Sequence, residues 1–156
     1  GNHYTELNEG FTAYKVAAHR HTPEMEQTLS HIAGQKIKLT FVPHLLPINR
    51  GILATCYAKL APGAELAAIR KAYENRYAGE FFIRLLPDGQ CANVKNVRCT
   101  NFCDISLFAD SRTGTFIAVS AIDNMVKGAA GQAIQNMNLA LGIDETAGLK
   151  LVPPAF

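Results

Sequence analysis

The stretch that decides the fold is residues 102–122, FCDISLFADSRTGTFIAVSAI. Its two apolar runs, 102–109 and 115–122, are rich in β-branched and aromatic residues, which is typical of strands. The residues between them, 110–114, include a glycine and suit a hairpin loop. A hairpin makes its two strands antiparallel neighbours, so the sequence predicts a sheet that is not purely parallel.

Further strands and helices can be predicted on both sides of this hairpin. Thr22 suits a helix N-cap with Pro23 at the first helical position, and Gly34 and Gly142 suit helix ends. Residues 94–97 form either a short strand or a loop. The expected strands cover residues 11–20, 36–42, 52–60, 81–85, 102–109 and 115–122, and the expected helices 22–33, 64–77 and 123–141, the last capped by Asp123.

This order of elements indicates the fold class. Helices do not follow every strand, as they would in a doubly wound parallel sheet. We therefore expect an α+β fold with a mixed, largely antiparallel sheet and helices on one face. At 156 residues the chain has the size of a single domain, 1–156, and its apolar fraction of 48% is sufficient for a core.

Composition and charge limit the partners. The net charge of +2 is small and dispersed, which argues against nucleic acid. No apolar run approaches the roughly 20 residues of a spanning helix, and no signal-peptide pattern opens the chain, so we expect a cytoplasmic protein without a membrane partner. Charged residues make up only 18%, which hints at surface covered by a partner domain or subunit. The cysteines form no C-x-x-C pair, and Cys103 is the least implausible reactive thiol.

Two histidines, His19 and His21, stand where the first expected strand gives way to a helix. Alternate residues of a regular strand share a face, so both rings can point into the same space. Histidine titrates near neutral pH and suits general acid–base catalysis. A solvated basic turn is the competing interpretation. A metal-dependent hydrolase is another, but no third ligand is identifiable, so we expect no metal.

The last expected helix is unusually small-faced. Gly128 and Gly131 lie inside it, although an interior glycine costs about 1 kcal/mol relative to alanine. Its apolar stripe, Val126, Ile134, Met137 and Leu141, packs either on this chain's own sheet or on a second domain. Arg50 has two comparable interpretations, as a bidentate anion clamp or as one half of a structural ion pair.

Three long motifs carry a resemblance to a known family. Residues 14–27, 43–55 and 120–138 read YKVAAHRHTPEMEQ, PHLLPINRGILAT and SAIDNMVKGAAGQAIQNMN. In this order they resemble N-acetyl-gamma-glutamyl-phosphate reductases, the arginine-biosynthesis members of the semialdehyde dehydrogenase superfamily. The resemblance covers the second half of a family member. It implies a fold like the C-terminal domain of glyceraldehyde-3-phosphate dehydrogenases, which supplies substrate contacts and a dimer interface.

The resemblance also implies a mechanism and site residues. The family reduces an acyl phosphate to a semialdehyde with NADPH through a cysteine nucleophile in a Gly-Cys-Tyr-Pro context, which no cysteine here has. By comparison His21, with His19 second, is the expected acid–base group, and Asn49 and Arg50 are weaker candidates for the substrate.

Asn124 matches the position that contacts the nicotinamide, and helix 123–141 is expected to dock on an NADP-binding domain that these residues lack. The expected protein is a homo-oligomer whose isolated second domain is inactive. A stand-alone binding or dimerisation module without catalysis is the alternative.

Overall fold

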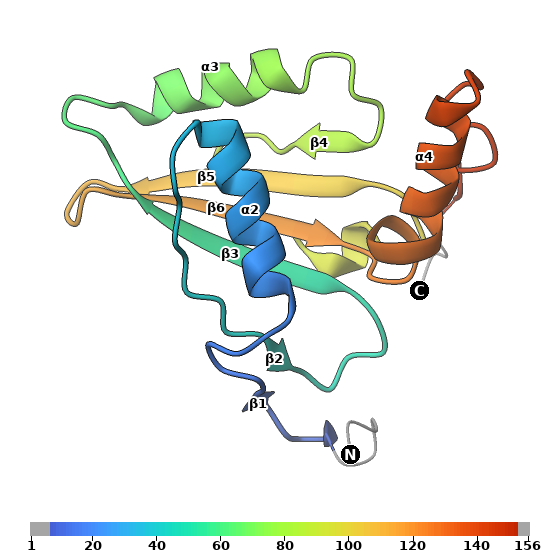
Figure 1. The fold of residues 1–156 in the computed structure, drawn as a ribbon, viewed down its shortest axis with the longest axis horizontal. Coiled ribbons are helices and arrows are strands. Elements are labelled where there is room, and N and C mark those ends of the chain that lie inside the picture. Colours follow the sequence, from blue (N-terminus) through green and yellow to red (C-terminus); the bar gives the residue numbers. More distant parts are fainter. Residues whose placement is uncertain (1–6, 153–156) are drawn as a thin grey trace. The chain divides into compact units, whose positions relative to one another are not determined.

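The computed structural model describes residues 7–152. They divide into two compact units, residues 1–49 and residues 50–156 of the chain. None of the helices in the described part of the chain is long and apolar enough to cross a membrane. Each unit has its own elements, shown in Figure 1.

The first unit contains one helix and a minimal strand pair. Strand β1 (Thr12–Ala13) pairs antiparallel with β2 (His44–Leu45). The strand predicted over 11–20 is wrong beyond Ala13. Lys15 and Ala17 adopt left-handed backbone angles, with φ of 46° and 53°, and the N–H of Ala18 donates to the Lys15 carbonyl at 3.0 Å. Left-handed residues cannot continue a strand, so the chain turns there.

Helix α2 (His21–Ala33) begins earlier than predicted. Its N-cap residue is Arg20, and Thr22, predicted as the cap, lies inside the helix. The N–H of Thr22 donates to the His19 carbonyl at 3.0 Å. The predicted end is confirmed, because Gly34 has a φ of 64° and donates its N–H to the His31 carbonyl.

The strand predicted over 36–42 is absent, although its alternating pattern is real. Its backbone donors bond to side chains of α2 and not to another strand. The N–H of Ile37 donates to Ser30 Oγ at 2.8 Å, and that of Leu39 donates to Glu26 Oε1 at 3.3 Å. Residues 37, 39 and 41 are half-buried while 36, 38 and 40 are exposed. An alternating pattern therefore indicates a segment with one buried face, and here that face packs against a helix.

The second unit is built on a four-stranded sheet in the order β3-β6-β5-β4. Its strands are β3 (Ile52–Lys59), β4 (Ile83–Leu85), β5 (Cys103–Asp110) and β6 (Thr115–Ile122). Strand β6 pairs antiparallel with both β3 and β5, whereas β4 pairs parallel with β5. The predicted hairpin and the mixed, largely antiparallel sheet of an α+β fold are confirmed.

Helix α3 (Leu66–Arg76) covers one face of this sheet (Figure 1). Its Tyr73 ring lies 6.2 Å from that of Phe116 on β6. The opposite face carries the core cluster Ala92, Val97, Val119 and Ala121. Residues 94–97, left open between strand and loop, contain the 3-10 helix η1 (Val94–Asn96).

The last predicted helix is divided into two parts. A π-helix, η2 (Val126–Ala130), precedes the α-helix α4 (Gly131–Ala140). The N–H groups of Gly128 and Ala130 donate to the carbonyls five residues earlier, at 2.9 and 3.2 Å. The prediction of one regular helix over 123–141 is therefore wrong in its first turns, while Asp123 caps the start and Gly142, with φ of 68°, follows the end as expected.

Candidate functional site

The two histidines lie together at the start of α2, within the first unit. Their ring centroids are 4.8 Å apart and the rings meet edge to face. Tyr14 and Phe41 contact the His19 ring with centroids at 5.5 and 5.3 Å. His19 is therefore half-buried among rings, while His21 is exposed. The rings are neighbours because a turn leads into a helix, not because they alternate on a strand as the sequence predicts.

A backbone hydrogen bond fixes the tautomer of His19. The N–H of His21 donates to His19 Nδ1 at 3.2 Å. A backbone amide can only donate, so Nδ1 must present its lone pair and the neutral ring carries its proton on Nε2. His19 precedes the N-cap residue Arg20, and its side chain thus holds the first residue of α2.

The charges around His19 favour the same state. Burial lowers the pKa of His19, and the neighbouring His21, Lys15 and Arg20 lower it further, against the opposing effect of Glu24. His19 is therefore neutral at neutral pH, with a donor on Nε2 and no lone pair to accept a proton there. Of the pair, only His21 has a ring without a recorded hydrogen bond among residues 7–152.

Arg50 and Asp123 form a two-pronged ion pair in the second unit. Arg50 Nη2 donates to Asp123 Oδ1 at 3.0 Å, and Arg50 Nε lies 2.8 Å from Oδ2. The Asp123 side chain has no exposed surface. Of the two interpretations of Arg50, the structural ion pair is the one observed, and a substrate anion would have to compete with a buried carboxylate.

Backbone donors complete the environment of Asp123. The N–H groups of Cys99, Met125 and Val126 donate to its carboxylate at 2.6, 2.8 and 3.0 Å. Burial alone would raise the pKa of Asp123, but these hydrogen bonds and the Arg50 guanidinium outweigh it and hold the pKa below its ordinary value. Asp123 therefore stays ionised and ties β3, the loop after η1 and the start of η2 to one point.

Asn124 is anchored beside this ion pair. Its Oδ1 accepts the N–H of Gly51 at 2.6 Å. Gly51 has a φ of 121°, and a Cβ there would lie 2.9 Å from Val94 Cβ, so the position requires glycine. The Asn124 amide is thus oriented by the backbone, and its Nδ2 is the end that a ligand could meet. Asn49, predicted beside Arg50, is exposed at the end of the first unit.

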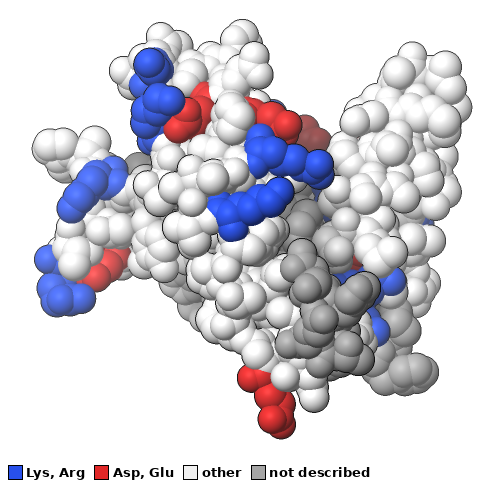
Figure 2. All heavy atoms as spheres, turned by 60° about the horizontal axis from the view of Figure 1, so that its bottom comes forward, with Lys and Arg blue, Asp and Glu red and all other residues white. Residues whose placement is uncertain are grey.

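Helix α4 buries polar side chains and exposes apolar ones, which is the reverse of the usual arrangement. Its buried residues are Gly131, Gln135 and Asn138. Met137 and Leu141 of the predicted apolar stripe remain 50% and 67% exposed. In Figure 2, residues other than Lys, Arg, Asp and Glu, drawn in white, make up much of the face shown. A water-soluble helix normally buries its apolar side, so this one presents a surface suited to a partner.

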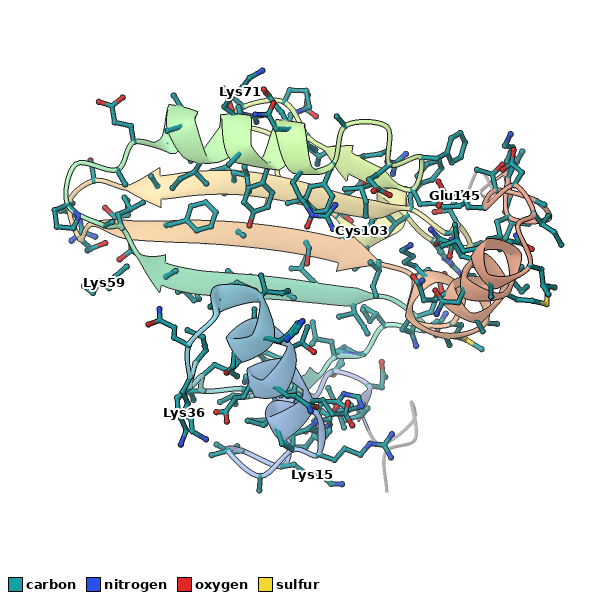
Figure 3. The ribbon with its side chains drawn as sticks, turned by 45° about the horizontal axis from the view of Figure 1, so that its top comes forward. Lys15, Lys36, Lys59, Lys71, Cys103 and Glu145 are labelled. Atoms are coloured by element: carbon teal, nitrogen blue, oxygen red, sulfur yellow. The ribbon has the colours of Figure 1, made fainter. Side chains whose placement is uncertain are left out.

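Other candidate groups are less suited to chemistry. Cys103 begins β5 at one end of the sheet (Figure 3). Burial raises the pKa of Cys103 despite the opposing charge of Lys127, whereas a nucleophilic thiol needs a lowered one. Among the residues that the structure describes, no group of three or more His, Cys, Asp or Glu side chains could hold a metal ion.

The structure thus gathers four of the predicted site residues into two groups, one in each unit, and leaves Asn49 outside both. His19 and His21 are together in the first, and Arg50 and Asn124 share Asp123 as a neighbour in the second. Sequence reasoning recognised Asp123 only as a helix cap and missed its ion pair. The available signal was an aspartate and an arginine at the ends of two apolar strands, residues that are rarely buried unless paired.

Comparisons with known proteins were made for the whole chain. A family model described as "Semialdehyde dehydrogenase, dimerisation domain" matches residues 1–124. An N-acetyl-gamma-glutamyl-phosphate reductase of Brachyspira hyodysenteriae is 61% identical over 155 residues, which are 99% of this chain and 44% of that protein. The same-named protein of Pelotomaculum thermopropionicum is 56% identical, covering 96% of this chain and 43% of its own length. The chain therefore spans less than half of these relatives.

Among solved structures, aspartate semialdehyde dehydrogenase II from Vibrio cholerae is similar in fold. The TM-score is 0.61 at 16% identity, over 87% of this chain and 38% of that one. A second structure of that protein, described as complexed with ASA, gives a TM-score of 0.59. At this identity the similarity concerns the fold alone, and it agrees with the predicted α+β class.

Proposed function

The chain belongs to the family of semialdehyde dehydrogenase dimerisation domains, and on this premise we propose that it is the second domain of an NADPH-dependent N-acetyl-gamma-glutamyl-phosphate reductase. The support is the 61% identity to a protein of that name across 99% of the chain. The reaction converts an acyl phosphate into a semialdehyde in arginine biosynthesis. The chain spans 44% of that relative, and we assign the nucleotide-binding domain and the nucleophilic thiol of the proposed enzyme to the rest of the protein.

The chemistry requires a proton to move near the carbonyl carbon. Thiolate attack releases phosphate and leaves a thioester, and hydride addition leaves negative charge on the former carbonyl oxygen. Collapse to the aldehyde then returns the sulfur as a leaving group. A group that titrates near neutrality and reaches both the sulfur and the oxygen can serve the first and the last of these reaction steps.

His21 is the residue to which we assign this proton transfer. The observation that carries the assignment is the hydrogen bond from the His21 N–H to His19 Nδ1. It leaves neutral His19 as a donor through Nε2, whereas the ring of His21 is exposed and has no recorded hydrogen bond among residues 7–152. His19 then orients the first turn of α2 and with it His21.

The remaining predicted contacts lie in the second unit. Asn124 is suited to a nicotinamide because Gly51 holds its Oδ1 and leaves the Nδ2 end as a donor. NADPH, when bound, would supply the hydride. Arg50 acts chiefly by holding Asp123, which in turn fixes the position of Asn124. Asn49 and the outer edge of Arg50 remain candidates for the substrate's charged groups.

The exposed apolar side of α4 supports a docking role. Met137 and Leu141 are exposed while polar Gln135 and Asn138 are buried. A nucleotide-binding domain that covers this side would explain the inversion. The family description further supports assembly into a homo-oligomer through this domain.

A chimaera tests the proposal. These 156 residues replace the corresponding part of the Brachyspira hyodysenteriae relative, and the purified protein is assayed for acyl-phosphate-dependent consumption or phosphate-dependent formation of NADPH. We expect turnover by the chimaera and none by the isolated chain. A folded chimaera without turnover would favour the alternative, a binding or dimerisation module that lacks catalysis.

A further inference from the structure

A small cavity lies in the second unit, apart from the groups discussed so far. Its volume is about 160 Å³, which is room for several water molecules and so for a phosphate ion. The cavity opens between the C-terminal end of α3 and the segment η2–α4. Among its lining residues are Arg76, Glu80, Phe82, Lys127 and Gln135.

Lys127 is the central polar group of this cavity. Its ammonium donates to Gln135 Oε1 at 2.7 Å and lies 5.5 Å from the centroid of the Phe82 ring. Within residues 7–152 no carboxylate is recorded at ion-pair distance from it. An ammonium has three N–H donors, and this half-buried one donates to a neutral amide beside an aromatic ring, while Glu80 and Glu145 act on it only from beyond ion-pair distance.

Gln135, the hydrogen-bond partner of Lys127, is a neutral amide and does not balance the charge of the ammonium. Its side chain is buried, with 8% exposed. Its Oε1 also accepts from Asn101 Nδ2 at 3.0 Å, and its Nε2 donates to Glu145 Oε2 at 3.0 Å. The amide is therefore fixed in one orientation, and Glu145, beside α4 in Figure 3, is held by the opposite end of that amide.

The other charged lining residues add a second cation. Arg76 Nη1 and Glu80 Oε1 are 3.8 Å apart, and both side chains are exposed, so their attraction is weak. Two cations and one carboxylate therefore line the cavity. Burial lowers the pKa of Lys127, and the raising effects of Cys103, Glu145 and Glu80 do not compensate. With two cations and one carboxylate, the lining of the cavity carries a net positive charge.

We propose that this cavity binds a small oxyanion of the phosphate class, held by the Lys127 ammonium with Arg76 at its rim. The charge-assisted N–H donors suit phosphate or sulfate oxygens, and Gln135 keeps the lysine in place. The Phe82 ring closes the apolar side. The proposal does not depend on the reductase assignment, because none of these residues belongs to the histidine group or to the Arg50–Asp123 pair.

Calorimetric titration of the full chain with inorganic phosphate tests the proposal. We expect saturable one-to-one binding that Lys127→Met weakens by about tenfold or more, which is the usual loss for a hydrogen bond from a charged group. Lys150→Met is the matched control, since Lys150 Nζ also lies over a ring, that of Phe81 at 5.3 Å, but outside this cavity. It should leave the affinity unchanged.

Two further arms keep the result decisive. Arg76→Gln alters an exposed helix end, so this variant should stay folded even if Lys127→Met does not. It should weaken phosphate binding. As a second comparison, acetate should bind the native chain less tightly than phosphate does. The NMR signal of the Lys127 side chain should shift upon phosphate addition. Binding that is equal in native chain and both variants would mark an adventitious ion only, and absent binding would overturn the proposal.

Discussion

At the residue scale, Asp123 connects the most parts of the second unit. It has no exposed surface, and it accepts from Arg50 and from the N–H groups of Cys99, Met125 and Val126. A buried carboxylate with this many donors is stable only as long as the donors stay in place. Replacing it with asparagine leaves the Arg50 guanidinium without a charged partner and puts an NH2 donor where one carboxylate oxygen accepted.

Asp123→Asn should therefore destabilise the protein by about 3–5 kcal/mol, the usual cost of breaking a buried ion pair from one side. Urea unfolding followed by circular dichroism measures this free energy. Asp88→Asn is the matched control, because Asp88 pairs with Arg70 at 2.6 Å but is 78% exposed. Its expected cost is at most about 1 kcal/mol. Equal losses in the two variants would contradict the importance of burial.

The stability should also depend on pH through Asp123. Its pKa is lowered in the folded chain, so the folded state binds the proton less tightly than the unfolded state. The resulting stabilisation is complete above the unfolded pKa, about 3.9, and is lost as the pH falls through the lower, folded pKa. Unfolding free energies measured across the acid range should fall steeply in the native chain and less steeply in Asp123→Asn. Parallel curves would exclude this role.

At the element scale, the junction between η2 and α4 depends on Gly131. A Cβ at this position would collide with Asn101 Oδ1 and lie 2.7 Å from Val126 Cγ1. At Gly128 the nearest atom, Ile122 Cδ1, is 3.4 Å away. The two glycines have the same helix propensity, so only their surroundings distinguish them.

Gly131→Ala should consequently destabilise the chain, by about 1–3 kcal/mol as for other overpacked sites. Gly128→Ala should be neutral or slightly stabilising, since alanine is favoured over glycine inside a helix by about 1 kcal/mol. Thermal unfolding of both variants provides the comparison. A stabilising Gly131→Ala would show that the close approach to Asn101 can relax.

The elements also show what the sequence could and could not predict. The hairpin 102–122, strand β3 and helix α3 follow from local patterns because each is long and has clear ends. The segments 11–20 and 36–42 do not, since alternation records only that one face is covered. In 36–42 the cover is α2, through Ser30 and Glu26, and in 11–20 the left-handed Lys15 and Ala17 end the strand. Neither signal is visible in residue types.

The site was predictable to a similar extent. The two histidines near the start of a helix could be singled out from their chemistry. They are neighbours as predicted, but because a turn leads into the helix and not because they alternate on a strand. The Arg50–Asp123 pair joins residues 73 positions apart in the chain. Pairing across such a separation depends on strand register, which periodicity alone does not specify.

At the scale of the whole molecule, exposed apolar surface points to a larger assembly. Met137 on α4 is 50% exposed, so replacing it in the isolated chain should change the stability by no more than about 0.5 kcal/mol. If a nucleotide-binding domain covers α4, Met137→Glu should instead lower the melting temperature and NADPH affinity of the chimaera. Calorimetry on both proteins measures the difference. Equal tolerance in both would place the docking surface elsewhere.

We propose that this chain supplies the proton-transferring histidine of a reductase. The most direct test is the kcat of the chimaera carrying His21→Asn or His19→Asn. The second variant keeps an acceptor near the position of Nδ1 and thus the hydrogen bond to the His21 N–H, so it should retain most activity. His21→Asn should lower kcat by about 10²–10⁴-fold. Full activity in His21→Asn, with loss in His19→Asn, would contradict the assignment and transfer the role to His19.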